Sequence, residues 1–214
     1  MSSSIFIFGA GGVAREVAWI IDDINKVEPK WDIKGFLVDG KCTTNYIDKI
    51  PVINGLNCLK DNQSPKVIIA VGSGAKRAEI ASRILSINSE TQFPNIIHPS
   101  VIKSNLVSFG VGNIIYPNCV ITTNVVIGNY NQIHIASVLS HDSIVKDYVT
   151  ILPGCNISGN VVLNEGCSLG VGSKIIQQKS VGRNSFIGAG AIVINSIPEG
   201  VLAVGIPAII KKKY

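Results

Sequence analysis

A repeat of six residues runs through the C-terminal half of this 214-residue chain. Because 46% of the residues are hydrophobic, fifteen consecutive matches would occur by chance about once in a hundred thousand trials. A period of six fits neither a helix nor an ordinary strand, so it indicates a structural repeat. The matching positions are Phe109, Ile115, Ile121, Ile127, Ile133, Leu139, Val145, Ile151, Ile157, Leu163, Leu169, Ile175, Val181, Ile187 and Val193.

A second column, four residues after each of these positions, is mostly small or slender. Large and small inward residues therefore alternate, as a narrow prism of short strands requires. Three six-residue sides make one coil, and identical sides stack every eighteen residues. This pattern predicts an all-β parallel β-helix of about five coils, with Gly128, Gly170, Gly182 and Gly188 helping the backbone to turn corners. The small positions are Cys119, Ser137, Ser143, Val149, Cys155, Val161, Cys167, Ser173, Ser185 and Ala191.

Composition argues against several classes of protein. The formal charge is +5, but only 15% of residues are charged, so no dense basic tract predicts nucleic-acid binding. The start of the chain has neither a basic region nor a long apolar core, and no run approaches a membrane span, so we expect no signal peptide and no membrane insertion. Three of the five cysteines fall in the small column, so we interpret them as buried packing residues rather than disulfide partners. This interpretation predicts that the protein is located in a reducing cytoplasm.

The N-terminal part, residues 1–92, alternates strands and helices. An apolar run, Ile5–Phe8, meets a glycine turn and then a helix with one apolar face, formed by Val13, Val17, Ile20, Ile21 and Ile24. A second strand, 33–38, ends at Asp39, and a third, 66–71, enters the turn Gly72-Ser73-Gly74 before a helix over about 75–85. This order predicts a small Rossmann-like α/β domain with a parallel sheet.

The first glycine turn, Gly9-Ala10-Gly11-Gly12, has three possible roles. Glycines let a ligand approach the backbone, and free amides at a helix start favour a phosphate. Ala14 stands where the third glycine of the dinucleotide fingerprint would be, and the domain is about half of a full dinucleotide fold. We therefore favour a nucleotide or nucleotide sugar over a dinucleotide, with a purely structural turn as the alternative.

The second predicted domain covers residues 93–214. His98, which precedes a proline, reads as a junction residue rather than a catalyst. The basic tail Lys211–Lys213 reads either as a solvated end or as a contact to a phosphate of the acyl carrier.

Four motifs together resemble one family. They are Phe8-Gly9-Ala10-Gly11-Gly12, His98-Pro99-Ser100, the hexapeptides containing His141-Asp142, and the closing Gly205-Ile206-Pro207-Ala208. The combination resembles the sialic acid O-acetyltransferase-like branch of the left-handed β-helix acyltransferases, which includes N-acetyltransferases of nucleotide-linked 4-amino-4,6-dideoxy sugars. The resemblance implies left-handed coiling, a homotrimer and acetyl-CoA as donor, whereas periodicity alone does not give the hand.

The resemblance also implies roles for individual residues. His141 matches the general base and Asp142 the carboxylate that follows it. Gly159 matches a position where backbone approaches the thioester end of the coenzyme, and Val171 and Ala189 resemble positions along the pantetheine arm. Segments that hold the sugar nucleotide correspond to Gly9, Ala10, Gly11, Gly12, Asp39, Gly72 and Ser73.

Two positions depart from the family pattern. Thr150 replaces a second histidine near the coenzyme, where its hydroxyl could still donate a hydrogen bond. His134 replaces an expected asparagine, and it either alters the sugar site or occupies an outward face.

These residues suit acyl transfer. Histidine titrates near neutral pH and can take the proton of an attacking amine. Neighbouring strand residues point to opposite faces, so a contact between His141 and Asp142 would require a corner. The three histidines show no zinc-site spacing, so we expect no catalytic metal. The expected function is N-acetylation of a dTDP-, UDP- or GDP-linked amino sugar for surface glycan assembly. The alternatives are O-acetylation of a sialic acid or related sugar, and a non-catalytic β-helix scaffold.

Overall fold

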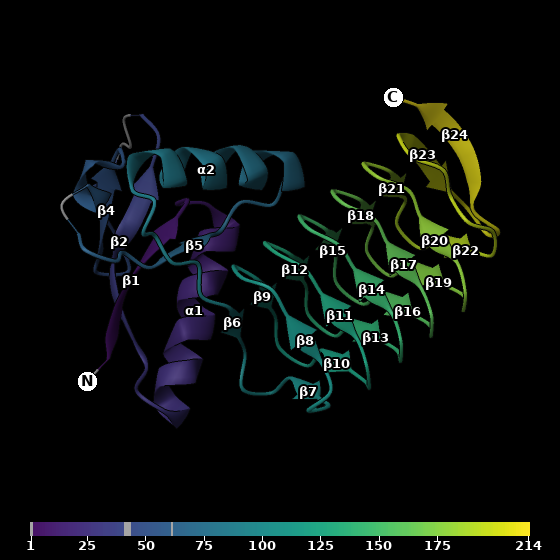
Figure 1. Cartoon of the computed structure of the whole chain (residues 1–214), viewed down its shortest axis with the longest axis horizontal. Helices are drawn as coiled ribbons and strands as arrows, with labels where there is room; N and C mark the ends of the chain where they lie inside the picture. Colours follow the sequence, from purple (N-terminus) through teal and green to yellow (C-terminus); the bar gives the residue numbers. More distant parts are fainter. Residues whose placement is uncertain (1, 41–43, 61) are drawn as a thin grey trace. The chain divides into compact units, whose positions relative to one another are not determined.

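The computed structural model describes residues 2–40, 44–60 and 62–214, so Cys42 lies outside the described residues. The chain divides into two compact units, Met1–Pro99 and Ser100–Tyr214 (Figure 1). The division falls at 99/100 rather than at the expected 92/93. Strand β6 (Ile96–Ile97) contacts helix α1 (Gly12–Val27), and His98 lies against Asp23 of that helix. Contacts of residues 96–98 with α1 therefore accompany the assignment of residues 93–99 to the first unit.

The first unit is an α/β domain whose sheet has the order β3-β4-β2-β1-β5. Strand β1 runs parallel to β2 and β5, and β2 runs parallel to β4, which confirms the predicted parallel sheet. The short antiparallel pair β3–β4 was not predicted. The remaining elements are β1 (Ser3–Phe8), β2 (Trp31–Val38), β3 (Tyr46–Ile47), β4 (Ile50–Asn54), the 3-10 turn η1 (Asn57–Leu59), β5 (Val67–Ile69) and α2 (Gly74–Ile87).

Helical periodicity explains how α1 packs. Its buried residues are Ala14, Val17, Ile20 and Ile21, which recur at the spacing of one helical face. The buried part of β1, Ile5–Phe8, belongs to the same core. The apolar face read from the sequence is thus the face that α1 buries.

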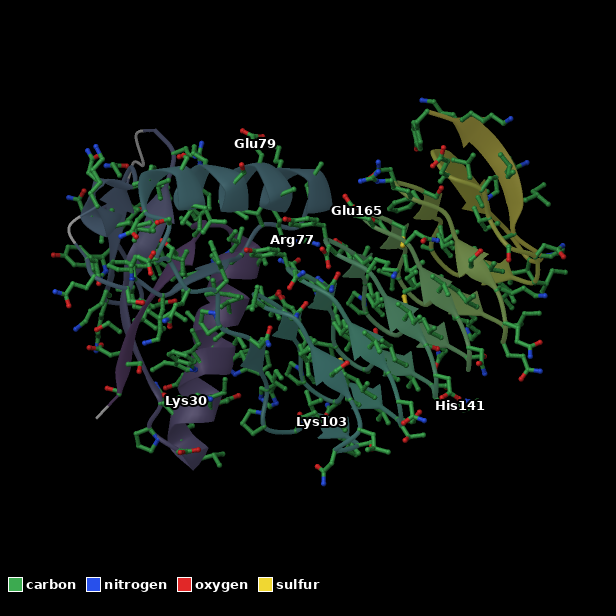
Figure 2. The ribbon with its side chains drawn as sticks, viewed as in Figure 1. Lys30, Arg77, Glu79, Lys103, His141 and Glu165 are labelled. Carbon is green, nitrogen blue, oxygen red and sulfur yellow. The ribbon has the colours of Figure 1, made fainter. Side chains whose placement is uncertain are left out.

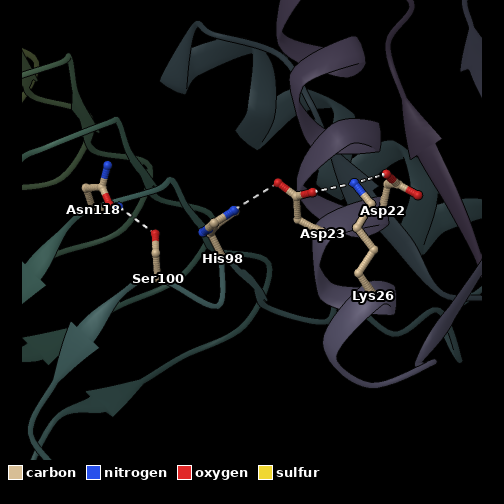
Figure 3. Close-up of polar contacts among 6 residues, drawn as sticks. All are labelled: Asp22, Asp23, Lys26, His98, Ser100 and Asn118. Carbon is tan, nitrogen blue, oxygen red and sulfur yellow. Dashed lines mark hydrogen bonds and ion pairs between the residues drawn. The ribbon is translucent and has the colours of Figure 1, made fainter.

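A polar network ties the end of this unit to α1 (Figure 3). His98 Nε2 lies 3.2 Å from Asp23 Oδ2, while Lys26 Nζ lies 2.9 Å from Asp23 Oδ1 and 2.7 Å from Asp22 Oδ2. Hydrogen bonds from Lys26 and then from His98 lower the pKa of Asp23. This arrangement supports the junction role of His98.

Replacing Asp23 with asparagine should lower the melting temperature at neutral pH by a few degrees. Because the folded-state pKa of Asp23 is lowered, its contribution is present above the ordinary aspartate pKa and is lost as pH falls through the folded value. The matched control is Asp22→Asn, since Asp22 contacts Lys26 without the additional contact to His98. Equal melting curves for the two variants in thermal scans at pH 7 would contradict the conclusion that the contact between His98 and Asp23 stabilises the fold.

The second unit is a three-sided β-helix. Its first side, the β7 face, consists of β7, β10, β13, β16, β19 and β22; the β8 face consists of β8, β11, β14, β17 and β20; the β9 face runs through β9, β12, β15, β18, β21, β23 and β24. The strands are β7 (Ile102–Lys103), β8 (Ser108–Phe109), β9 (Ile114–Ile115), β10 (Val120–Ile121), β11 (Val126–Ile127), β12 (Gln132–Ile133), β13 (Val138–Leu139), β14 (Ile144–Val145), β15 (Thr150–Ile151), β16 (Asn156–Ile157), β17 (Val162–Leu163), β18 (Ser168–Leu169), β19 (Lys174–Ile175), β20 (Ser180–Val181), β21 (Phe186–Ile187), β22 (Ile192–Val193), β23 (Val201–Val204) and β24 (Ile209–Lys213).

The pairing register confirms the eighteen-residue coil. Ile121 pairs with Leu139, which pairs in turn with Ile157, in parallel strands. Of the fifteen predicted inward positions, all except Phe109 are at most 1% exposed. Phe109 lies in one of the first strands of the unit and is half-buried. The predicted apolar ladder is therefore the core of the β-helix.

Polar side chains of the small inward column also form hydrogen bonds with backbone groups. Ser143 Oγ donates to Ser158 O at 3.0 Å and accepts from Val161 N at 3.2 Å, which links successive coils. Cys119, Cys155 and Cys167 are fully buried, as predicted, and burial raises the pKa of the Cys119 thiol to about 11. Small polar side chains in this column thus satisfy corner peptide groups without filling the prism.

The corners are made by left-handed residues at a strict spacing of six. Asn118, Asn124, Asp142 and Asn160 have φ between 56° and 59°, and Gly154 has φ 70° at a position of the same series. The glycines expected to turn corners play a different part. Gly128, Gly170, Gly182 and Gly188 are absent from the positive-φ residues, and each has neighbours within 2.2–2.6 Å of where a Cβ would stand. They are needed because adjacent coils approach closely, not because of φ.

Candidate active site

His141 lies on the corner that follows β13 and precedes β14, where the β7 face meets the β8 face; we name it the β7/β8 corner. Its side chain is 54% exposed, and Figure 2 shows it at the edge of the β-helix. Its Nδ1 atom lies 2.8 Å from Asp142 Oδ2. The sequence prediction that His141 lies at a corner or rim is confirmed.

Asp142 reaches its neighbour because the backbone turns there. In a flat strand the two side chains would point to opposite faces, but Asp142 has φ 59° and forms the corner itself. The hydrogen bond from His141, followed by one from Asn124, lowers the pKa of Asp142. An ionised Asp142 carboxylate can only accept a hydrogen bond, so Nδ1 of His141 carries the hydrogen and Nε2 is the nitrogen that can take up a proton.

Gly159 lies one coil later at the same corner, under the imidazole of His141. A Cβ on Gly159 would stand 2.4 Å from Cε1 and 2.6 Å from Nε2 of that ring. The main chain joins the same coils, since Asn160 N donates to His141 O at 2.9 Å. Glycine therefore provides the space in which the imidazole lies.

The other residues predicted around the coenzyme lie elsewhere on the prism. Val171 and Ala189 occupy the corner where the β9 face meets the β7 face, here named the β9/β7 corner, and Thr150 is a buried residue of β15 on the β9 face. One chain thus brings His141, Asp142 and Gly159 together but does not bring Thr150, Val171 or Ala189 to the same corner.

His134 follows β12, directly after the inward residue Ile133, and is only 9% exposed. Its ring stacks on Tyr116, one coil earlier, with centroids 4.3 Å apart and an interplanar angle of 18°. A six-residue period places His134 at the β9/β7 corner, but only the structure revealed the aromatic partner. His134 therefore does not lie beside His141 in one chain.

In the first unit, the predicted glycine turns lie at the carboxyl ends of β1 and β5. Gly9 has φ +117°, and its Cβ would stand 2.8 Å from Ala70 O, so glycine is required there. A Cβ atom added to Gly11 or Gly12 would have no neighbouring atom within 4 Å. No side chain caps the N-terminus of α1. The start of α1 is therefore neither capped by a side chain nor crowded around these glycines, which suits an anion site.

The residues of the second glycine turn, and the acidic residue Asp39, already have hydrogen-bond or ion-pair partners within the protein. Ser73 Oγ accepts from Lys76 N at 3.4 Å and caps α2, and Gly72 O accepts from the buried Arg77 at 2.8 Å. Asp39 lies 2.6 Å from Nη2 of Arg83. Sequence reasoning missed both arginines, because only the packing of α2 beside the strand ends brings them there.

Over residues 2–40, 44–60 and 62–214, no group of three or more His, Cys, Asp or Glu side chains is arranged to hold a metal ion. Neither helix in this part of the chain is long and apolar enough to cross a membrane.

Solved structures with the same fold cover nearly the whole chain. The acetyltransferase domain of PglB from Neisseria gonorrhoeae, in complex with acetyl coenzyme A, is 24% identical, with a TM-score of 0.87 over 99% of this chain and 100% of that one. A perosamine N-acetyltransferase from Caulobacter crescentus, as a histidine-to-asparagine variant with CoA and GDP-perosamine, is 24% identical, with a TM-score of 0.89 over 99% and 98%. WeeI from Acinetobacter baumannii is 26% identical, with a TM-score of 0.86 over 98% and 100%.

Sequence similarity is more local. A serine acetyltransferase from Haemophilus influenzae is 34% identical over 74 residues, which is 31% of this chain and 28% of that protein. A galactoside O-acetyltransferase from Lactococcus lactis is 37% identical over 60 residues, 28% of this chain and 29% of that protein. The matches span less than a third of these relatives. Residues 4–84 match the PglD N-terminal domain. The chain therefore has the fold of the hexapeptide acetyltransferases: a domain matching the PglD N-terminal domain, followed by a left-handed parallel β-helix.

Proposed function

We propose that this chain transfers the acetyl group of acetyl-CoA to the 4-amino group of a nucleotide-linked 4-amino-4,6-dideoxyhexose, for surface glycan biosynthesis. The single observation that carries the proposal is the hydrogen-bonded His141–Asp142 pair on an exposed corner. The imidazole of this pair fits there because Gly159 has no side chain. The fold supports it, because both the PglB domain and the perosamine N-acetyltransferase align over 99% of this chain. The nucleotide is dTDP, UDP or GDP.

The proposed chemistry is direct transfer. The amine nitrogen attacks the thioester carbonyl carbon, a C–N bond forms, and the C–S bond breaks with CoA leaving as the thiolate. Nε2 of His141 takes the proton that the amine nitrogen must lose, and this proton can then pass to the thiolate. Asp142 stabilises the imidazolium formed in between. No covalent acyl-enzyme is required, because both substrates bind together.

The first unit is the proposed site for the sugar nucleotide. The start of α1, which has no side-chain cap, suits a diphosphate, and Gly11 and Gly12 leave room for it, while Gly9 shapes the turn that precedes them. Asp39 and Arg83 lie near the carboxyl ends of the strands, where ligands of open α/β sheets bind. We propose that Ala10, Gly72 and Ser73 line the same site.

The separation of the two corners supports a homotrimer. His141 and Gly159 lie at the β7/β8 corner, whereas Val171 and Ala189 lie at the β9/β7 corner of the same prism. A coenzyme that contacts both sets must therefore bridge two copies, with Thr150 supplied from the β9 face of the neighbour. Apolar side chains point outward on the β8 face, including Val126, which is 47% exposed. Light scattering with size exclusion tests the trimer.

O-acetylation is the second candidate, because one of the local relatives is a galactoside O-acetyltransferase. An alcohol is a weaker nucleophile than a neutral amine, so this reaction would depend even more strongly on the base. Thiol release with a panel of amino sugars, sialic acids and other hydroxy sugars separates the two reactions. A non-catalytic scaffold would instead show no coenzyme A binding by calorimetry.

Nucleotide-linked 4-amino sugars should raise the melting temperature in the presence of coenzyme A, because a ligand that binds only the folded state stabilises it. At a ligand concentration of a hundred times the Kd, the free energy of unfolding rises by about 2.7 kcal/mol. A thermal-shift screen of dTDP-, UDP- and GDP-sugars measures this, and the matching 4-hydroxy sugars serve as controls. Stabilisation by the hydroxy sugars alone would favour O-acetylation, and no stabilisation by any sugar nucleotide would contradict the proposed substrate class.

A further inference from the structure

Asn124 lies on the coil that precedes the His141–Asp142 pair, at the same β7/β8 corner. It stands eighteen residues before Asp142, and both residues adopt the left-handed conformation, with φ of 56° and 59°. Its Nδ2 atom donates to Asp142 Oδ1 at 3.1 Å, while Asp142 Oδ2 accepts from His141 Nδ1 at 2.8 Å. Each oxygen of the carboxylate is therefore held by a different donor.

Two donors on separate oxygens fix the plane of a carboxylate that one donor would leave free to rotate. This matters because Asp142 is exposed, with 46% of its side chain accessible, and water competes for both oxygens. Asn124 is also neutral, so it orients the carboxylate without cancelling the negative charge that faces His141. An aspartate at 124 would repel Asp142, and a lysine would compete with the imidazole for it.

The backbone holds the two corner residues in register. Asp142 N donates to Thr123 O at 3.1 Å, immediately before Asn124. The coils are also paired on both sides of the corner, Ile121 with Leu139 and Val126 with Ile144. Asn124 therefore meets Asp142 because of the eighteen-residue coil, and not through a flexible loop.

We propose that Asn124 is a positioning residue: it holds the Asp142 carboxylate so that His141 keeps its proton on Nδ1 and presents Nε2 to the amine. The catalytic consequence rests on the proposed function of His141 as the base. Asn124 acts through Asp142 and does not touch the reacting atoms. Three consecutive coils then build the site: Asn124 on the first, the histidine–aspartate pair on the second and Gly159 on the third.

The test compares Asn124→Ala and Asn124→Asp with the control Asn118→Ala. Asn118 has the same left-handed conformation (φ 59°) and is also exposed, but it lies at the β9/β7 corner, where its N–H donates to Ser100 Oγ (Figure 3). In the protein without substrates, ¹⁵N NMR of the imidazole should show His141 in the Nδ1–H tautomer. Both Asn124 variants should shift the population toward Nε2–H, and Asn118→Ala should leave it unchanged.

In the enzymatic assay, both Asn124 variants should lower kcat by about threefold to tenfold, since a partly exposed hydrogen bond to a charged group is lost. KM for either substrate should stay constant, because Asn124 acts on the reaction through Asp142 alone. Tautomer populations and kcat equal to those of the unchanged protein in both variants would overturn the proposal. If no acceptor sugar is acetylated by the unchanged protein, the proposed function fails, and the tautomer measurement still decides the role of Asn124.

Discussion

Replacing His141 with alanine is expected to lower kcat by roughly 10²- to 10⁴-fold, which is the usual contribution of a general base. His141 is exposed and its Nδ1 is held by Asp142, so the substitution removes the proton acceptor without opening the core. The loss corresponds to about 3 to 5 kcal/mol of transition-state stabilisation. Thiol release with acetyl-CoA and the best acceptor sugar measures the rate.

His141→Asn is the matched variant, because it keeps a polar side chain of similar reach but cannot take up the proton. It should be as slow as the alanine variant, and both should melt close to the unchanged protein. A further control is His98→Ala, since His98 packs against Asp23 in the other unit and has no proposed part in the chemistry. Full turnover by His141→Ala in a folded protein would remove His141 from the mechanism.

Replacing Gly159 with alanine is expected to lower kcat by about 10- to 100-fold with little change in melting temperature. The added Cβ would stand 2.4 Å from Cε1 of His141, so the imidazole must move. A displacement of about 1 Å from the reactive position can cost 10²-fold in rate. The fold should tolerate alanine, because Gly159 does not have a positive φ and the ring can swing outward into solvent.

A double-mutant cycle identifies the cause of this loss. If Gly159 acts only by giving the imidazole its place, Gly159→Ala should have no further effect on kcat in a His141→Ala background. An equal loss in both backgrounds would show that the added methyl group acts independently of His141, for example by blocking the thioester end of acetyl-CoA. Measuring KM for acetyl-CoA in all four proteins separates these outcomes.

The regular part of the fold could be predicted because its cause is local in each coil. A side chain such as Leu139 must be large and apolar since the prism has one inward position per side, and a column residue such as Ser143 must be small since the interior is narrow. Similarly, one apolar face in residues 13–24 predicts α1. The short strands β3 and β4 carry no comparable period, and they were missed.

The site could be predicted only in part. The histidine–acid pair stands out in the sequence, and the eighteen-residue period identifies Gly159 as the vertical neighbour of His141. Neither pattern gives the direction of a side chain at a corner. The contact between Asn124 and Asp142 depends on two left-handed residues whose side chains project from the same corner. The same holds for Arg83, which reaches Asp39 across 44 residues of sequence.

By itself, the sequence determined the two-part architecture, the coil length and the inward residues, because the size and polarity of side chains at fixed spacing decide which of them can be buried. The tertiary structure decided which residues meet on the β7/β8 corner. It also divided the chain at 99/100. These outcomes depend on backbone dihedral angles and on distances between coils, and no residue pattern along one chain contains them.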